Sequence, residues 1–130
     1  MTPIPEKYSE FTYALFRFIA GALFVFHGMQ KLFGWPGGKE PADLMSLRGL
    51  AGVIETFGGL MIAFGIAAAW AAFLASGTMA VAYFMSHAKG GFLPIINKGE
   101  LAVLYCFVFL FIATRGSGRY SLDHALSRRR

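Results

Sequence analysis

Hydrophobic residues are grouped along this chain into long runs that polar and Gly/Pro-rich stretches separate. The first run covers residues 11–33 and ends at Gly34-Trp35-Pro36-Gly37-Gly38, a segment that cannot continue a helix. The second run extends from Leu50 to Met85 with Glu55 as its sole charge. At about 1.5 Å per residue it is nearly twice as long as a bilayer core. The chain must therefore reverse direction within it, and we predict the turn at residues 65–70.

A third, shorter apolar run follows the polar residues near position 90. Because the second run supplies two spans, the pattern predicts four membrane-spanning helices. The predicted spans cover about residues 11–33, 49–67, 69–87 and 98–115, and a basic tail follows at 116–130. The expected fold class is all-α. Residues 1–130 would form a single domain, an integral membrane bundle of four transmembrane helices.

Composition and charge support this membrane assignment. Of the 130 residues, 56% are hydrophobic and only 15% are charged, which leaves too little polar surface for a soluble domain. Arginines outnumber acidic residues in the C-terminal segment, which carries Arg115, Arg119, Arg128, Arg129 and Arg130. The positive-inside rule places this segment in the cytoplasm, and an even number of spans places the N-terminus there too. Because topology explains the net charge of +5, no nucleic-acid partner is predicted.

The cysteine and histidine content limits the chemistry of the chain. Cys106 is the single cysteine, which excludes an intramolecular disulfide and a two-cysteine redox centre, and its apolar surroundings indicate a packing residue. His27 and His87 lack the spacing of metal ligands, so no metal site is predicted. The sequence also contains no C-x-x-C-H haem motif and no Gly-rich dinucleotide-binding loop.

Several polar residues interrupt the apolar runs, although a charge at the centre of a membrane helix costs about 3 kcal/mol. The candidates for ligand binding or proton exchange are Arg17, His27, Lys31, Glu55, Tyr83, His87, Asn97 and Glu100. The predicted topology places all of them except Arg17 in the outer half of the bundle. We expect Glu55 and Glu100 to face inward and to pair with Lys31, Arg17 or a protonated histidine. Such pairs are either static interhelical salt bridges or parts of a functional site.

Helical spacing brings charges and glycines onto common faces. One stripe of the first helix combines Arg17, Gly21, Phe24, Gly28 and Lys31. One side of the second helix combines Gly52, Glu55, Gly58 and Gly59. Small residues let a neighbouring backbone approach closely, so Gly28, Gly58 and Gly59 are predicted to have a structural role around the carboxylate.

A series of short motifs follows one another along nearly the whole chain. They are Arg17-x-x-x-Gly21, Phe26-His27-Gly28-x-x-Lys31-Leu32-Phe33-Gly34, Ile54-Glu55-x-x-Gly58-Gly59-x-x-x-x-x-Gly65, Asn97-Lys98-Gly99-Glu100-x-Ala102-x-x-Tyr105 and Gly116-x-Gly118-x-Tyr120-Ser121-Leu122-Asp123. Their order and spacing resemble the DoxX family of small bacterial membrane proteins. The resemblance implies a four-helix bundle in the bacterial cytoplasmic (inner) membrane. One departure is Ala67-Ala68, where relatives often carry Thr-Arg after the glycine.

The closing motif has a local structural interpretation. Tyr120 suits a headgroup interface, and Ser121 can cap a short helix whose first turn contains Asp123. Asp123 is also expected to hold Arg115 or Arg119 and so to fix the tail beneath the bundle.

The DoxX resemblance implies a redox-associated protein, because the family takes its name from a subunit associated with a terminal quinol oxidase. On this hypothesis the outer-half pocket binds a quinone: Glu55 and Glu100 exchange protons, and His27, Lys31 and His87 bind or polarise the quinone oxygens. Aromatic side chains would cover the ring, namely Phe24, Tyr83 and Tyr105. Whether this chain itself is catalytic is left open.

Two alternative functions fit the same residues. Intramembrane carboxylates and histidines also occur in components that transport a small solute or protons, for which a chain of four spans would assemble into a homo-oligomer. A non-catalytic membrane scaffold is the third alternative. The partners expected under these hypotheses are membrane lipid, a quinone, subunits of a redox complex and further copies of the chain.

Overall fold

The computed structural model describes residues 1–129, and all regular secondary structure in this part of the chain is helical. Arg130, the last residue of the predicted basic tail, lies outside the described residues. The four long helices are α1 (Ser9–Phe33), α2 (Leu47–Phe64), α3 (Ala68–Ser86) and α5 (Glu100–Arg115). The short helices are η1 (Glu6–Tyr8), η2 (Ala88–Gly90), α4 (Pro94–Asn97) and α6 (Leu122–Ser127). The all-helical prediction is therefore confirmed.

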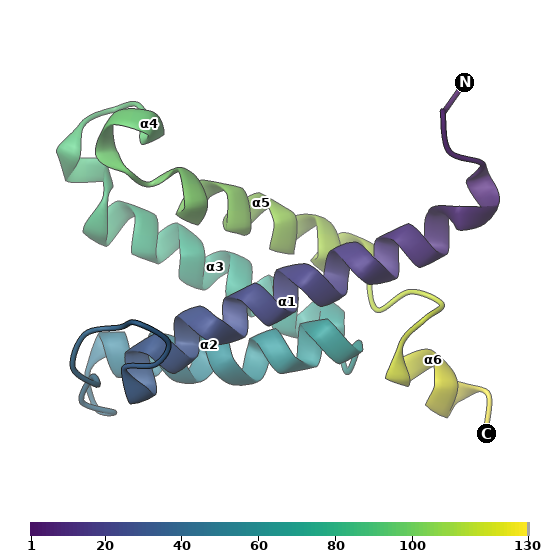
Figure 1. The fold of residues 1–130 in the computed structure, drawn as a ribbon, viewed down its shortest axis with the longest axis horizontal. Coiled ribbons are helices and arrows are strands. Elements are labelled where there is room, and N and C mark those ends of the chain that lie inside the picture. Colours follow the sequence, from purple (N-terminus) through teal and green to yellow (C-terminus); the bar gives the residue numbers. More distant parts are fainter. Residues whose placement is uncertain (130) are drawn as a thin grey trace.

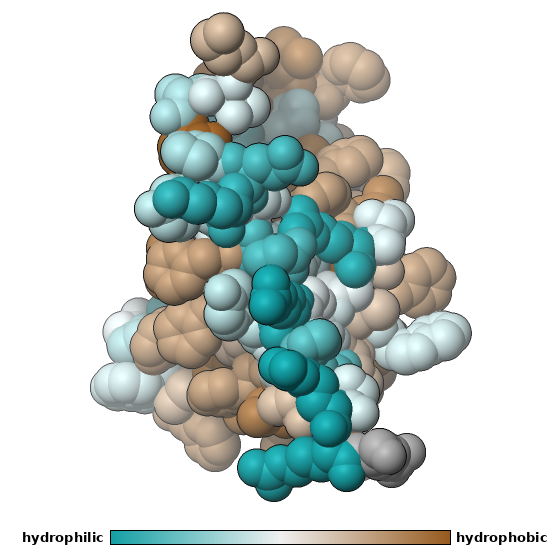
Figure 2. Space-filling view, turned by 90° about the vertical axis from the view of Figure 1, so that its right-hand side faces the viewer, coloured by the Kyte–Doolittle hydropathy of each residue, from teal (hydrophilic) through white to brown (hydrophobic). Residues whose placement is uncertain are grey.

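The long helices lie side by side, and their connections gather at two ends (Figure 1). Residues 34–46 and 87–99 form one end, called the loop end below. The turn at 65–67, both chain termini and α6 form the other, called the terminal end. Helix α1 packs mainly on α2, and α3 packs mainly on α5, while α2 and α3 join these two pairs. Figure 2 looks onto the terminal end, where hydrophilic residues form a band between hydrophobic flanks.

Among residues 1–129, three segments are long and apolar enough to cross a membrane, namely Glu6–Phe33, Leu47–Phe64 and Ala68–Ser86. Helix α5 has 16 residues. It is therefore about 24 Å long, which is shorter than a hydrocarbon core of about 30 Å. The assignment as a helical membrane protein holds, whereas the fourth span and the cytoplasmic position of the termini remain predictions.

Glycines bring the backbones of α1 and α2 into contact. A Cβ added to Gly21 or Gly28 would lie 2.5 Å from a backbone nitrogen of α2. A Cβ on Gly59 would lie 2.7 Å from the carbonyl oxygen of Gly21. Gly58 differs from the prediction, because nothing lies within 4 Å of the place its Cβ would take. One residue turns a helix by about 100°, so Gly58 lies beside the contact face and not on it.

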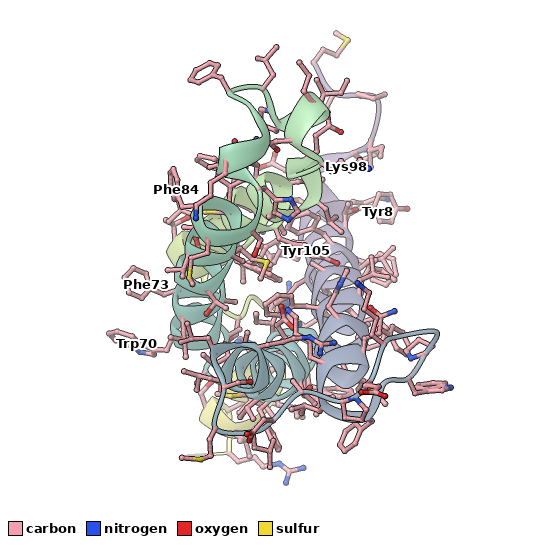
Figure 3. The ribbon with its side chains drawn as sticks, turned by 90° about the vertical axis from the view of Figure 1, so that its left-hand side faces the viewer. Tyr8, Trp70, Phe73, Phe84, Lys98 and Tyr105 are labelled. Carbon is pink, nitrogen blue, oxygen red and sulfur yellow. The ribbon has the colours of Figure 1, made fainter. Side chains whose placement is uncertain are left out.

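Aromatic packing connects α1 to α5 in the middle of the bundle. The ring centroid of Phe24, which is fully buried, lies 4.6 Å from that of Phe109 and 5.6 Å from that of Tyr105. Tyr105 and Phe109 are stacked with an interplanar angle of 10°. Figure 3 looks along the bundle from the loop end and shows Tyr105 between the helices, whereas Trp70, Phe73 and Phe84 point outward from α3.

Candidate functional site

An ion pair between α1 and α2 is the centre of the candidate site. The Nζ atom of Lys31 lies 2.5 Å from Oε1 of Glu55. The Glu55 side chain is 1% exposed and the Lys31 side chain is 27% exposed. This contact agrees with the expected pairing of Glu55 with Lys31. Close packing helps to hold it, because a Cβ on Gly52 would lie 3.1 Å from Cβ of Lys31.

The other carboxylate oxygen of Glu55 is unsatisfied. Its Oε2 atom is buried and has no hydrogen-bond partner among residues 1–129. A buried polar atom without a partner costs about 1–3 kcal/mol, so native proteins rarely leave one without a reason. This oxygen is an acceptor that a donor from a bound molecule can satisfy.

Two further polar rings accompany the ion pair. His27 precedes Lys31 by four residues on α1, so the two side chains lie one helical turn apart on the same side of that helix. The ring of His27, which is half-buried on α1, meets the Tyr105 ring edge-on with 5.8 Å between their centroids. From the sequence, Tyr105 was predicted only to pack over the ring of a bound quinone. Its place in the motif that begins at Asn97 was the one signal of a larger role.

A groove of about 890 Å³ opens between α2 and α3 and is lined by Lys31. Apolar side chains of both helices form most of its walls, such as Ile54, Phe73 and Val81. Phe73 and Val81 are more than half exposed, so the groove opens to the surface that faces lipid. Because Lys31 also contacts Glu55, it connects the groove with the buried carboxylate.

Tyr83, His87 and Asn97 form a separate cluster at the loop end. Asn97 Nδ2 donates to the Tyr83 hydroxyl at 3.0 Å and to the Gly91 carbonyl at 2.9 Å, while its Oδ1 accepts from Gly99 N at 2.8 Å. Nδ1 of His87 lies 3.2 Å from the Asn97 carbonyl oxygen. Since Asn97 uses both side-chain polar atoms in these bonds, the cluster holds the chain between α3 and α5 in place.

Arg17 was one of the alternative partners predicted for the buried carboxylates, but no carboxylate pairs with it among residues 1–129. Its Nη1 donates to the carbonyls of Ile62 and Ala63 at 2.5 and 2.8 Å, and its Nη2 donates to that of Tyr120 at 2.7 Å. The last carbonyls of a helix lack partners within the helix, and its dipole favours a cation there. Arg17 therefore caps the C-terminus of α2 at the terminal end. It lies about 21 Å along α1 from Lys31.

Asp123 binds the turn between α2 and α3. Its Oδ2 accepts from Ala67 N at 2.8 Å and from Ser117 Oγ at 2.6 Å, and its own N–H donates to the Gly65 carbonyl at 3.0 Å. Ala67 precedes α3 and has no side-chain acceptor that could cap it. Asp123 instead fixes the backbone of Ala67 itself, from a distant part of the chain.

The expected pairing of Asp123 with Arg115 or Arg119 is wrong. Both arginines contact Glu10 instead. Its Oε1 lies 2.6 Å from Nη2 of Arg115, and its Oε2 accepts from the backbone N of Arg119 at 3.1 Å. Ser121 caps α6 as predicted, because its Oγ accepts from His124 N at 3.2 Å.

Glu100 faces outward, so the prediction that it points into the bundle is also wrong. It is exposed and has no ion pair within residues 1–129. The buried face of α5 contains Ala102, and two residues of helix rotate Glu100 by about 200° from it. Leu104 and Phe107 share its face as expected, but they too are exposed. Apolar residues face lipid as well as the core, so hydrophobicity alone did not indicate the direction.

The candidate residues thus occupy several places. One group consists of the ion pair and the two rings beside it, namely Lys31, Glu55, His27 and Tyr105. A second group lies at the loop end and consists of Tyr83, His87 and Asn97. Arg17 and Glu100 are separate from both groups. Within the described part of the chain, no group of three or more His, Cys, Asp or Glu side chains could hold a metal ion.

Known proteins resemble this chain over most of its length. The family model described as DoxX matches residues 12–88. A protein of Haemophilus influenzae (strain ATCC 51907 / DSM 11121 / KW20 / Rd), described as "Uncharacterized protein", is 38% identical over 127 residues, which cover 92% of this chain and 93% of that protein. No solved structure matches the chain significantly.

Proposed function

The chain belongs to the DoxX family, and from this premise we propose that it binds the head of a quinone or quinol beside Glu55, as part of a membrane redox system. In this proposal α1, α2, α3 and α5 all span the bacterial inner membrane with both termini in the cytoplasm. The site then lies in the outer half of the bundle. The observation that carries the proposal is the buried, unpartnered Oε2 atom of Glu55.

The polar groups around Oε2 match the hydrogen bonds of such a head. A quinol hydroxyl donates, and the free carboxylate oxygen of Glu55 accepts. A quinone carbonyl accepts, and the Lys31 ammonium is a donor. The carboxylate can also exchange a proton with the hydroxyl of a bound quinol, which makes Glu55 the proposed proton-exchanging residue.

The groove between α2 and α3 suits the rest of the ligand. Its volume of about 890 Å³ lies within the range of about 300–1,000 Å³ that is typical of small-molecule sites. An apolar tail can lie against Ile54 and Val81 while the head reaches Lys31. Entry from the bilayer through this groove requires no passage through water.

Binding of a short-chain ubiquinone or menaquinone analogue to the purified protein tests the proposal. We expect saturable binding that Glu55→Gln weakens about tenfold or more, the equivalent of about 1.4 kcal/mol. Glu40→Gln is the matched control, because Glu40 is exposed in the loop at 34–46. Each variant is first checked for a cooperative thermal transition in detergent.

The same experiment separates a ligand site from a static salt bridge. If the wild-type protein shows no saturable binding, or if folded Glu55→Gln binds as tightly as wild type, the quinone proposal fails. The Lys31–Glu55 pair would then be a lock between helices in a non-catalytic scaffold.

A further inference from the structure

A second groove lies on the outside of the bundle, between α4 and the outer face of α5. Its volume is about 910 Å³. Exposed apolar side chains form its walls, among them Ile95, Leu104 and Phe107. Two charged residues line it, Lys98 and Glu100. Figure 3 shows Lys98 next to α4, away from the middle of the bundle that Tyr105 occupies.

With α5 as the proposed fourth span, this groove lies at the level of lipid. With 16 residues the helix is about 6 Å shorter than a hydrocarbon core. The segment before it is apolar and open: Phe92 is 92% exposed, Ile95 is 73% exposed and Ile96 is 64% exposed. These side chains extend the apolar surface beyond the start of α5. The groove beneath them therefore faces acyl chains close to the headgroups.

Lys98 and Glu100 are opposite charges without ion-pair partners in the described part of the chain. Charges close to the headgroups are attracted by lipid charges of the opposite sign, so both side chains can bind a headgroup. An anionic lipid would satisfy Lys98 but would be repelled by Glu100. Phosphatidylethanolamine carries a phosphate and a primary ammonium next to each other, and that ammonium has N–H donors that phosphatidylcholine lacks.

We propose that this groove binds one phosphatidylethanolamine molecule from the leaflet at the loop end. Its phosphate contacts Lys98, its ammonium contacts Glu100, and one acyl chain lies along Leu101, Leu104 and Phe107. The proposal is independent of the quinone site, because Glu100 lies on the opposite side of α5 from Ala102 and the bundle core. It gives a function to a charge that the bundle interior does not use.

Native mass spectrometry of the delipidated protein tests this lipid proposal. The protein is titrated with phosphatidylethanolamine, phosphatidylglycerol and phosphatidylcholine of identical acyl chains. We expect one phosphatidylethanolamine to bind at least severalfold more tightly than either other lipid. Glu100→Gln should remove the preference over phosphatidylglycerol, and Lys98→Gln should weaken all three lipids. Lys89→Gln is the control, since Lys89 is exposed at the same end but does not line the groove.

A variant that fills the groove addresses the tail. Leu104→Trp leaves both charges in place and should reduce binding of all three lipids to a similar degree, with an unchanged thermal transition. The proposal would be overturned if wild type bound the three lipids equally tightly, or if Glu100→Gln kept the preference of wild type for phosphatidylethanolamine. A dimer in the spectrum that Glu100→Gln dissociates would also overturn it, because a second copy of the chain would then cover this groove.

Discussion

Lys31 Nζ and Glu55 Oε1 lie 2.5 Å apart across the α1–α2 interface, and the two side chains differ greatly in exposure, 27% against 1%. If the pair is broken, Lys31 can move its ammonium toward water at the loop end on a flexible stem. Glu55 has no such route. Removing the lysine therefore leaves a buried charge, whereas removing the charge of the glutamate does not.

Lys31→Met should consequently destabilise the protein more than Glu55→Gln does. An uncompensated buried carboxylate costs about 3–5 kcal/mol, and the glutamine variant should lose clearly less. The double variant Lys31→Met/Glu55→Gln should recover much of the loss. Thermal unfolding in one detergent measures all three, and equal losses for the two single variants would contradict the expected asymmetry.

Gly59→Ala should separate α1 from α2, because the new methyl group would lie 2.7 Å from the Gly21 carbonyl oxygen. Overpacking of this kind costs about 1–3 kcal/mol. The neighbouring Gly58→Ala is a matched control, since nothing lies within 4 Å of its added Cβ. It should be neutral or slightly stabilising. Similar unfolding midpoints for the two variants would show that the interface tolerates a methyl group at Gly59.

Arg17→Met should release the C-terminal segment from the bundle. The substitution removes the donors to the carbonyls of Ile62, Ala63 and Tyr120 and leaves buried acceptors unsatisfied. Arg17→Lys keeps the charge but lacks the planar fork, so it should show an intermediate effect. Trypsin cleavage after Arg119 measures the release. Unchanged cleavage rates in Arg17→Met would mean that other contacts hold the segment.

Asp123→Ala should weaken the turn before α3 by about 1 kcal/mol, the usual net contribution of a hydrogen bond. The Oδ2 atom of Asp123 accepts from Ala67 N and Ser117 Oγ, so the Ala67 amide should exchange its hydrogen faster in the variant. Asp43→Ala is the control, because Asp43 accepts from Met45 N at the opposite end of the molecule. Equal exchange at Ala67 in wild type and Asp123→Ala would argue against a stabilising role of this hydrogen bond.

Local periodicity predicted the α1 surface well. Arg17, Phe24 and Gly28 follow one stripe in the sequence, and all three are buried in the structure. The contact of Lys31 with Glu55 also followed from the pattern, because a charge in an apolar helix needs a partner. Both inferences depend on spacing within one element or on the high cost of a lone charge.

Other features had no such signal. The partners of Arg17 are backbone carbonyls, which every residue carries, so no residue type in the sequence indicated them. The acceptor for Ala67 comes from Asp123, far along the chain, and nothing local identifies that contact. The outward direction of Glu100 was hidden because lipid and the bundle core accept the same side chains.

The division of the bundle into an α1–α2 pair and an α3–α5 pair has a mechanical consequence. The glycine contacts at Gly21 and Gly59 join α1 and α2 main chain to main chain, so these two helices should move as one rigid body. The turn at residues 65–67 connects that body to the other. Glu55 belongs to the first body and Tyr105 to the second, so any rotation of one body against the other would change the distance between the two residues.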